Sequence, residues 1–414
     1  MSEPDTSKRR EGHEKGTTRR GMRILVRFLA YQIASWTALA VVAHGLFRGA
    51  ALLVGLFAVY TTIPLLLFVR WRGWPFYPGA LFRIIVVRMV LYAQLLLPFA
   101  AGATVVGLLI GWPLGMPLII GRALAAAVVG AGASVLLLGY FGSRRLVVRE
   151  VEARVPSLPR EFDGLRIAQI SDLHVGPQTS RRFLGAVARA VARAAPDVVA
   201  VTGDVVDDRA EDVSWYAAAF SELDAPLGVF LIPGNHDIYA GWDAVARALR
   251  QRTDATILVN EAHLLEREGA RLAIVGTGDP AAGIRRNPSA AAAATAAPDL
   301  ERALSRVPRG TTVVAFAHNP ALWPRLAERG VALTLSGHTH WGQFAMPRLG
   351  WSLASPFLEH AMGGHRAGNA LLYINPGTGY WGIPFRLGAF PEITIVTLRC
   401  ADQAELSVGA ARAA

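Results

Sequence analysis

Two closely spaced histidines, His338 and His340, are the residues of this chain best suited to metal chemistry. They stand in the sequence Gly337-His338-Thr339-His340, directly after an apolar run at residues 331–335. In an extended chain, residues at i and i+2 point their side chains to the same side. A strand that ended here would therefore present two neutral nitrogen ligands at its carboxyl end.

Four other short motifs share this form, in which a His, Asp or Asn follows an apolar, β-type run. The runs cover residues 165–170, 198–201, 229–232 and 313–316. The motifs that follow them are Ser171-Asp172-Leu173-His174, Gly203-Asp204, Gly234-Asn235-His236-Asp237 and Ala317-His318-Asn319. A single buried histidine is more often a satisfied core residue than a ligand. Five of the ten histidines fall in these motifs, however, and this repetition argues for a shared site.

The candidate ligands supply nitrogen and oxygen donors and no sulfur. They are Asp172, His174, Asp204, Asn235, His318, His338 and His340. Seven such ligands suit two divalent ions that share one bridging carboxylate, and imidazole with carboxylate favours Mn, Fe, Zn or Co over Ca. Two ions about 3.5–4 Å apart can hold a hydroxide between them and bind two oxygens of a phosphoester. Asp204 is the expected bridge, because Gly203 allows the backbone to approach closely.

His236 is the candidate general acid. It lies beside the ligand Asn235 on one short loop, and the pKa of histidine suits proton transfer to a leaving oxygen near neutral pH. Asp237 has two alternative roles: it could orient His236, or it could cap a helix that begins at this loop.

Alternating strand and helix patterns position these motifs. Short apolar runs alternate with segments of helical period, such as residues 181–194 and 242–250, from residue 146 to the last apolar run at 393–398. This order predicts a layered α/β domain, in which sites form at the carboxyl ends of strands. Residues 147–155 alternate like an edge strand. The Ala-rich residues 281–298 are predicted to form a flexible excursion near the site.

The composition indicates a membrane part and a soluble part. The chain is 52% hydrophobic, with a mean hydropathy of +0.34. Residues 1–150 hold 17 Lys and Arg against 5 Asp and Glu, a balance of +12, and the remainder holds 25 against 26, a balance of −1. The basic excess thus belongs to the membrane part, and no nucleic-acid partner is expected. The single Cys400 excludes an internal disulfide framework and a Cys-based metal cage.

Four apolar stretches, at residues 28–47, 50–69, 86–111 and 118–141, are each long enough to cross a bilayer, which needs roughly 20 residues. Arginines gather before the first, between the second and third, and after the fourth. The positive-inside rule then places both termini, and the soluble domain, in the cytoplasm of a multi-pass cell-membrane protein. A transport pathway would leave ionisable residues deep inside the spans, so the spans are interpreted mainly as an anchor.

Three parts are therefore expected: a disordered basic cytoplasmic arm (1–23), a transmembrane domain of four helices (24–145) and a catalytic domain (146–414). The arm is polar and basic and has no apolar period. Its pair Arg19-Arg20 before an apolar run could alternatively be a twin-arginine export signal. Arg27 interrupts that apolar region, and no small-residue cleavage site is evident.

The order D-x-H, G-D, G-N-H-D, a later H and G-H-x-H resembles the calcineurin-like metallophosphoesterase superfamily over residues 146–400. Residues 337–343 with Gly350, residues 379–387 and Pro391-Glu392-Ile393-Thr394 resemble its bacterial membrane-associated phosphodiesterase branch. The resemblance implies a four-layer α-β-β-α sandwich, here preceded by four transmembrane helices. It also implies that Asp172, His174, Asp204 and His340 bind one ion. Asp204, Asn235, His318 and His338 would bind the other, with His236 as the acid.

The sequence departs from the family at positions that are not ligands: Trp341, Asn375-Pro376-Gly377, Ala321 and the Ala-rich loop after Asp279-Pro280. These departures bear on the substrate. The favoured hypothesis is a membrane-anchored phosphodiesterase, for which a lipid or lipid-linked head group is one accessible substrate. The alternatives are a catalytically silent metal-binding sensor or scaffold and a two-metal hydrolase of non-phosphate bonds. The oligomeric state does not follow from the sequence.

Overall fold

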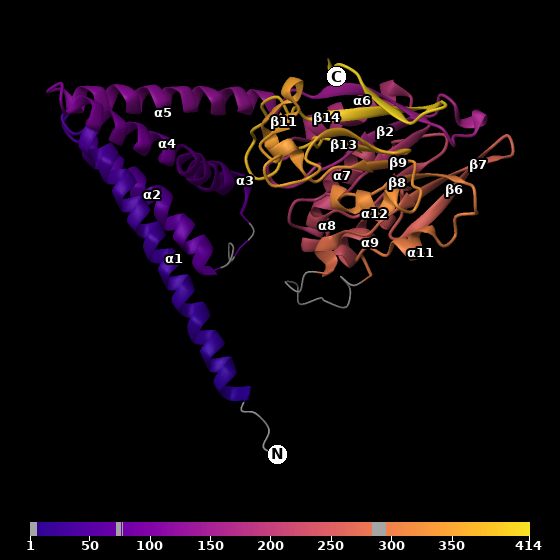
Figure 1. The fold of residues 1–414 in the computed structure, drawn as a ribbon, viewed down its shortest axis with the longest axis horizontal. Helices are drawn as coiled ribbons and strands as arrows, with labels where there is room; N and C mark the ends of the chain where they lie inside the picture. The colour runs from indigo at the N-terminus through magenta and orange to yellow at the C-terminus, as the bar shows by residue number, and fades with distance from the viewer. Residues whose placement is uncertain (1–5, 72–75, 77, 284–294) are drawn as a thin grey trace. The chain divides into compact units, whose positions relative to one another are not determined.

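The computed structural model describes residues 6–71, 76, 78–283 and 295–414 and divides into two compact units between Leu136 and Leu137 (Figure 1). Within these residues, four helical segments are long and apolar enough to cross a membrane: Leu25–Ala43, Ala50–Trp71, Ala80–Gly111 and Pro117–Gly142. The first lies within α1 (Thr6–Ala43), and the second and fourth are α2 (Ala50–Trp71) and α5 (Pro117–Gly142). The third joins α3 (Ala80–Phe82), a π-helical turn at Arg83–Val87 and α4 (Arg88–Gly111).

The expected disordered arm is corrected for residues 6–23, which form the beginning of α1. The absence of an apolar period suggested disorder, but Lys, Arg and Glu are good helix formers and can continue a helix that the following apolar segment nucleates. Residues 1–5 lie outside the described residues.

Polar side chains and small residues join the helices of the first unit. The side-chain nitrogen of Gln32 on α1 donates to Gln94 on α4 over 2.7 Å, and Thr62 on α2 donates to the side-chain oxygen of Gln32 over 3.2 Å. On α4, a Cβ added at Gly107 would lie only 2.6 Å from the Cα of Gly121 on α5. Side-chain hydrogen bonds and close contact at small residues both stabilise helix packing in a membrane.

The second unit, Leu137–Ala414, contains the predicted catalytic domain and is called the catalytic unit below. It has two large mixed sheets and a small one. The first large sheet has the spatial order β15 (Glu405–Val408), β1 (Val147–Val155), β14 (Glu392–Cys400), β2 (Arg166–Ile170), β3 (Val198–Val201), β4 (Val229–Leu231) and β5 (Thr256–Ile257), with β16 (Arg412–Ala413) paired to β1. The second has the order β12 (Gly363–Ala367), β13 (Ala370–Ile374), β9 (Leu333–Ser336), β8 (Thr312–Phe316), β7 (Ala270–Gly276) and β6 (Glu261–Arg267). A hairpin of β10 (Ala345–Met346) and β11 (Trp351–Ser352) forms the small sheet.

The alternation of side chains along each strand builds four layers. On β3, Val198 and Ala200 face the second sheet, whereas Val199 and Val201 face the outer helices. The outer helices of the first sheet are α6 (Arg181–Ala194), α7 (Val213–Phe220), α8 (Asn235–Tyr239) and α9 (Trp242–Arg252). The other face of the second sheet packs against α11 (Leu300–Leu304) and α12 (Trp323–Ala327) (Figure 1). The predicted four-layer α/β architecture is confirmed.

The structure bears on two further expectations, one about the strand at residues 147–155 and one about the Ala-rich segment. The strand at residues 147–155 is not an edge strand, because β14 pairs with one side of β1 and β15 and β16 with the other. These partner strands all lie near the other end of the chain, which local alternation does not reveal. The predicted flexible excursion begins as a 3-10 turn at Pro280–Gly283, and residues 284–294 lie outside the described residues.

Candidate metal centre

All seven candidate ligands lie just beyond the carboxyl ends of neighbouring strands. Asp172 and His174 follow β2, Asp204 follows β3, and Asn235 begins α8 after β4. On the second sheet, His318 follows β8, and His338 and His340 follow β9. Because the parallel strands of both sheets end at the same side of the sandwich, ligands as far apart in the sequence as Asp172 and His340 meet there.

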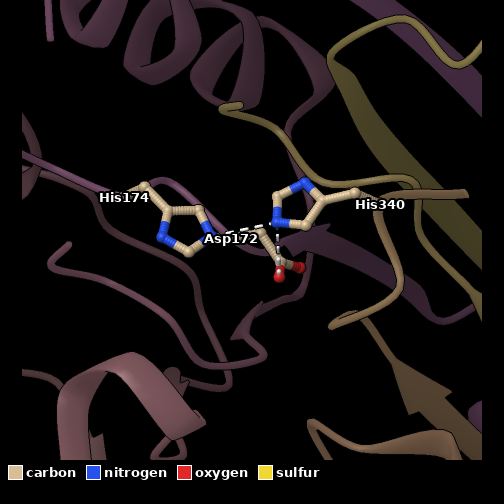
Figure 2. A group of neighbouring side chains, drawn as sticks. All are labelled: Asp172, His174 and His340. Carbon is tan, nitrogen blue, oxygen red and sulfur yellow. Dashed lines mark hydrogen bonds and ion pairs between the residues drawn. The ribbon is translucent and has the colours of Figure 1, made fainter. Parts of the chain in front are cut away.

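The first group of ligands contains Asp172, His174 and His340, all buried (Figure 2). The Nε2 atoms of His174 and His340 lie 2.9 Å apart, and His340 Nε2 is 3.4 Å from Asp172 Oδ1. The donor atoms of the three residues all lie within 4.8 Å of one another, which is close enough for one cation to contact all three.

The second group contains Asn235, His318 and His338. Asn235 Oδ1 is 2.7 Å from His338 Nδ1 and 3.2 Å from His318 Nε2. The other nitrogen of His318, Nδ1, donates to the carbonyl oxygen of Thr202 over 2.8 Å. This hydrogen bond fixes the tautomer that leaves Nε2 available as a ligand.

Asp204 lies between the two groups. Its Oδ2 is 3.6 Å from His174 Nε2 of the first group and 3.3 Å from His318 Nε2 of the second. Its Oδ1 accepts a hydrogen bond of 2.7 Å from the backbone N–H of His236. The carboxylate is therefore oriented by the chain and shared by both groups, as a bridging ligand must be. The predicted donor set fits two divalent cations in chemistry and in placement.

Two glycines allow this close arrangement. A Cβ added at Gly203, which has φ +91°, would lie 2.7 Å from His318 Nδ1, and one added at Gly234 would lie 2.2 Å from Asp204 Oδ1. The expectation that Gly203 permits close backbone approach is thus confirmed.

The expected extended geometry of His338 and His340 is corrected. Their φ angles are +69° and +50°, so the chain turns sharply after β9 and the two rings meet different partners. Asp172, His174 and Asp204 also have positive φ, at 52°, 45° and 52°. Left-handed backbone is uncommon and strained in residues other than glycine, and such strain concentrates at functional sites.

Burial and charge shift the pKa values of the histidines in opposite directions. Burial, aided by the positive charge of His318, lowers the pKa of His338 to about 4. Burial and the guanidinium of Arg386 lower the pKa of His340 well below its ordinary value. Burial opposes protonation of His174 and His318 as well, but the acidic groups around them, including Asp204, raise both pKa values above the ordinary value. The metal-free site therefore holds protons that a cation would displace.

His236, the predicted acid, is part-buried at the rim of the site. Its Nδ1 donates to the carbonyl oxygen of Asp207 over 2.7 Å and lies 3.7 Å from the Asp207 carboxylate. Nε2 is left as the atom that could exchange a proton with a substrate.

The structure shows the capping role for Asp237, the second of its two alternatives. Its Oδ2 accepts from Gly234 N over 2.9 Å and its Oδ1 from Val206 N over 3.1 Å. The side chain thus holds the start of α8. The acidic residue beside His236 is Asp207.

Sequence reasoning missed Asp207, Asp279 and Arg386. Asp207 could have been found from its position three residues after Asp204, on the same loop. Asp279 follows β7 at the same edge of the second sheet, and burial raises its pKa to about 6, against the opposing pull of His318. Arg386 is the only charged residue among residues 379–390, and this isolation was the signal that it is buried with polar partners.

Arg386 is fully buried and contacts His340 directly. Its Nη1 donates to the carbonyl oxygens of His340 and Pro376 over 3.0 and 2.5 Å, and its Nη2 lies 2.6 Å from His340 Nδ1. A guanidinium has donors only, so Nδ1 accepts and a neutral His340 carries its proton on Nε2. Nε2 would bind a cation only in the other neutral tautomer, with the proton on Nδ1 and the Arg386 contact rearranged.

Comparison with known proteins shows which proteins this chain is similar to. Residues 165–342 match the family model described as calcineurin-like phosphoesterase. An uncharacterized metallophosphoesterase of Helicobacter pylori is 32% identical over 276 residues, which cover 65% of this chain and 70% of that protein. A Danio rerio transmembrane protein with a metallophosphoesterase domain is 31% identical over 263 residues, or 61% of this chain and 57% of that one. The solved structure of sulfate thiohydrolase SoxB of Thermus thermophilus overlaps 62% of this chain and 56% of its own, with 15% identity and a TM-score of 0.33.

The chain belongs to the calcineurin-like metallophosphoesterases, and the resemblance found in its motifs is confirmed. It is a member whose described residues include four candidate membrane spans.

Proposed function

We propose that this protein is a membrane-anchored phosphodiesterase that uses two divalent metal ions. The single observation that carries the proposal is the position of Asp204, whose Oδ2 lies within 3.6 Å of ligands from both groups. Two cations that shared this carboxylate would supply Lewis-acid stabilisation of the phosphoryl oxygens and an activated water. Mn, Fe, Zn and Co all suit the nitrogen and oxygen donors.

The protein's own residues have distinct roles in this proposal. Asp172, His174, Asp204 and His340 hold one ion, and Asp204, Asn235, His318 and His338 hold the other. His236 donates a proton from Nε2 to the leaving oxygen, while the Asp207 carbonyl oxygen holds its Nδ1. The Asp207 carboxylate lies 3.7 Å from the same Nδ1 and helps to orient the ring.

The anchor determines where the enzyme acts. The arginine distribution supports a multi-pass protein whose catalytic domain faces the cytoplasm. A site held at the bilayer would have access to lipid and lipid-linked phosphodiesters. Protease access in intact cells tests the orientation, since digestion of the catalytic domain from outside would contradict it.

The central test is hydrolysis of bis(p-nitrophenyl) phosphate by the purified full-length protein with Mn²⁺. Asp204→Ala should abolish the activity, because it removes the ligand common to both ions. Asp402→Ala, at an exposed aspartate in a turn, is the matched control and should keep it. Full activity in Asp204→Ala would refute the mechanism. A wild type that binds two ions without turnover would favour the sensor or scaffold.

A further inference from the structure

Exposed large apolar side chains are concentrated in one part of the catalytic unit. Among its described residues after Gly142, eight such side chains are exposed, and five of them lie on the stretch 346–358: Met346, Leu349, Leu353, Phe357 and Leu358. Leu349 and Phe357 are 73% and 81% exposed. Two of the other three, Tyr239 and Trp381, lie beside the predicted acid His236. Apolar surface that gathers in this way marks an interaction site.

The residues that lead into this stretch, Gln343 and Ala345, are hydrogen-bonded to the loop at residues 381–387. Ala345 N donates to Leu387 O over 2.9 Å, and Leu387 N donates to Gln343 O over 3.0 Å. The amide of the Gln343 side chain exchanges two further hydrogen bonds of 3.0 Å with the backbone of Trp381. We call residues 345–358 the apolar hairpin, since β10 and β11 form its base.

The same loop is attached to the end of a candidate membrane span. Arg386 N donates to the carbonyl oxygen of Gly139 over 2.8 Å. A Cβ added at Gly139 would meet the Phe385 ring at 2.1 Å, so helix and loop are in direct contact. Gly139 lies within the span Pro117–Gly142, and residues 137–142 belong to the same compact unit as the catalytic domain.

The loop also reaches the site. The side chain of Arg386 contacts His340, so a single residue joins the end of the span to a candidate ligand. The rings of Trp381 and Tyr239, which are 53% and 56% exposed, lie 6.1 and 5.6 Å from the His236 ring. An apolar group on a leaving alcohol would meet these two rings next to the proton donor.

We infer that the apolar hairpin docks on the surface of the bilayer that α5 spans and that the site draws its phosphoester from lipid head groups there. The second part of this inference rests on the proposed function. A bilayer fits better than a protein partner because the loop hydrogen-bonded to the base of the hairpin also contacts Gly139 and Gly142 at the end of α5. In addition, residues 345–358 contain Trp351 and one arginine, Arg348, and no acid. Tryptophan and arginine are typical of the bilayer interface.

Site-specific fluorescence tests the docking. Phe357→Cys, prepared with Cys400→Ser to remove the native thiol, carries an NBD label in full-length protein. The protein is placed in nanodiscs of phosphatidylethanolamine and phosphatidylglycerol, with or without doxyl-labelled lipid. The label at 357 should be quenched by the doxyl lipid. A label on Glu268→Cys, in the exposed turn between β6 and β7, is the control and should not be.

Quenching at 357 no stronger than at 268 would overturn the inference. Emission that instead depends on protein concentration would overturn it in favour of contact between two copies of the chain.

Substrate preference tests the second part. In the nanodiscs, wild type should prefer hexadecyl over ethyl p-nitrophenyl phosphate. In the double variant Leu349→Ser with Phe357→Ser, the ratio of the hexadecyl rate to the ethyl rate should fall about tenfold. The variant should still hydrolyse the ethyl ester at the wild-type rate. Val408→Ser, at an exposed apolar residue outside the hairpin, should change neither. An unchanged preference in the double variant would refute the lipid substrate. Hydrolysis of neither ester by wild type, with quenching at 357 intact, would refute the proposed function and support the docking.

Discussion

Replacement of Arg386 by methionine is the change whose effect on stability can be worked out most directly from the structure. The guanidinium is completely buried, and burial lowers its pKa from an ordinary 12.5 to about 9. It still donates to four carbonyl oxygens, those of His340, Pro376, Gly379 and Ala389, the shortest bonds being the 2.5 Å contacts to Pro376 and Gly379. Methionine fills a similar volume and donates to none of them.

The expected loss is about 3 kcal/mol of unfolding free energy. Each buried carbonyl left without a donor costs about 1–3 kcal/mol, which for the two shortest bonds gives about 2–6 kcal/mol. Removing a buried charge returns part of this cost, so the lower half of that range is the net expectation. For a domain of this size the loss corresponds to a fall in Tm of about 6–12 °C.

Thermal unfolding of the metal-free protein, followed by circular dichroism in detergent, measures this change. Arg399→Met is the matched control, because Arg399 forms only half-exposed ion pairs with Glu152 and Asp163. Its effect should stay within about 1 kcal/mol. The reasoning is refuted if Arg386→Met unfolds within 2 °C of wild type, or if Arg399→Met is equally destabilised.

Three further predictions concern the site. His236→Gln should lower kcat by about 10²–10⁴-fold for an alkyl phosphodiester and much less for a p-nitrophenyl leaving group, which needs no acid; equal losses for both esters would argue against the assigned role. Asp279→Asn should raise the Tm of metal-free protein relative to wild type increasingly as pH rises from 5 to 7.5. The folded pKa of Asp279, about 6, exceeds the unfolded value of about 4, so the wild type loses stability across this interval; a constant difference in Tm would contradict this. Loading with Mn²⁺ at pH 7 should raise Tm and release protons into an unbuffered indicator solution, because His174 and His318 have raised pKa values and must lose a proton to act as ligands; binding without proton release would refute the assigned protonation states of these two histidines.

The sequence sufficed to locate the candidate ligands, because their placement depends on a local rule. Each follows a short apolar strand, and strands of one parallel sheet end at a common edge. Asp172, Asp204 and His318 could therefore be predicted to meet although long segments separate them. The four-layer fold follows from the same alternation of strands and helices.

Features that depend on distant contacts could not be predicted in this way. Arg386 lies 46 residues from His340, so its isolation among apolar residues could signal burial but not which residue it contacts. The interior position of β1 depends on β14 and β15 at the other end of the chain. The helical start of α1 shows a related limit, since the absence of an apolar period does not prevent helix formation where propensity is high.

The left-handed backbone at five of the seven candidate ligands has an evolutionary consequence. Each of these residues holds a conformation that costs a non-glycine residue about 1–2 kcal/mol. Glycine at any of these positions would relax the loop and delete a metal donor in one step. Selection for stability and selection for catalytic activity therefore favour different residues at these five positions. A library of variants screened for thermal stability alone should become enriched in glycine there.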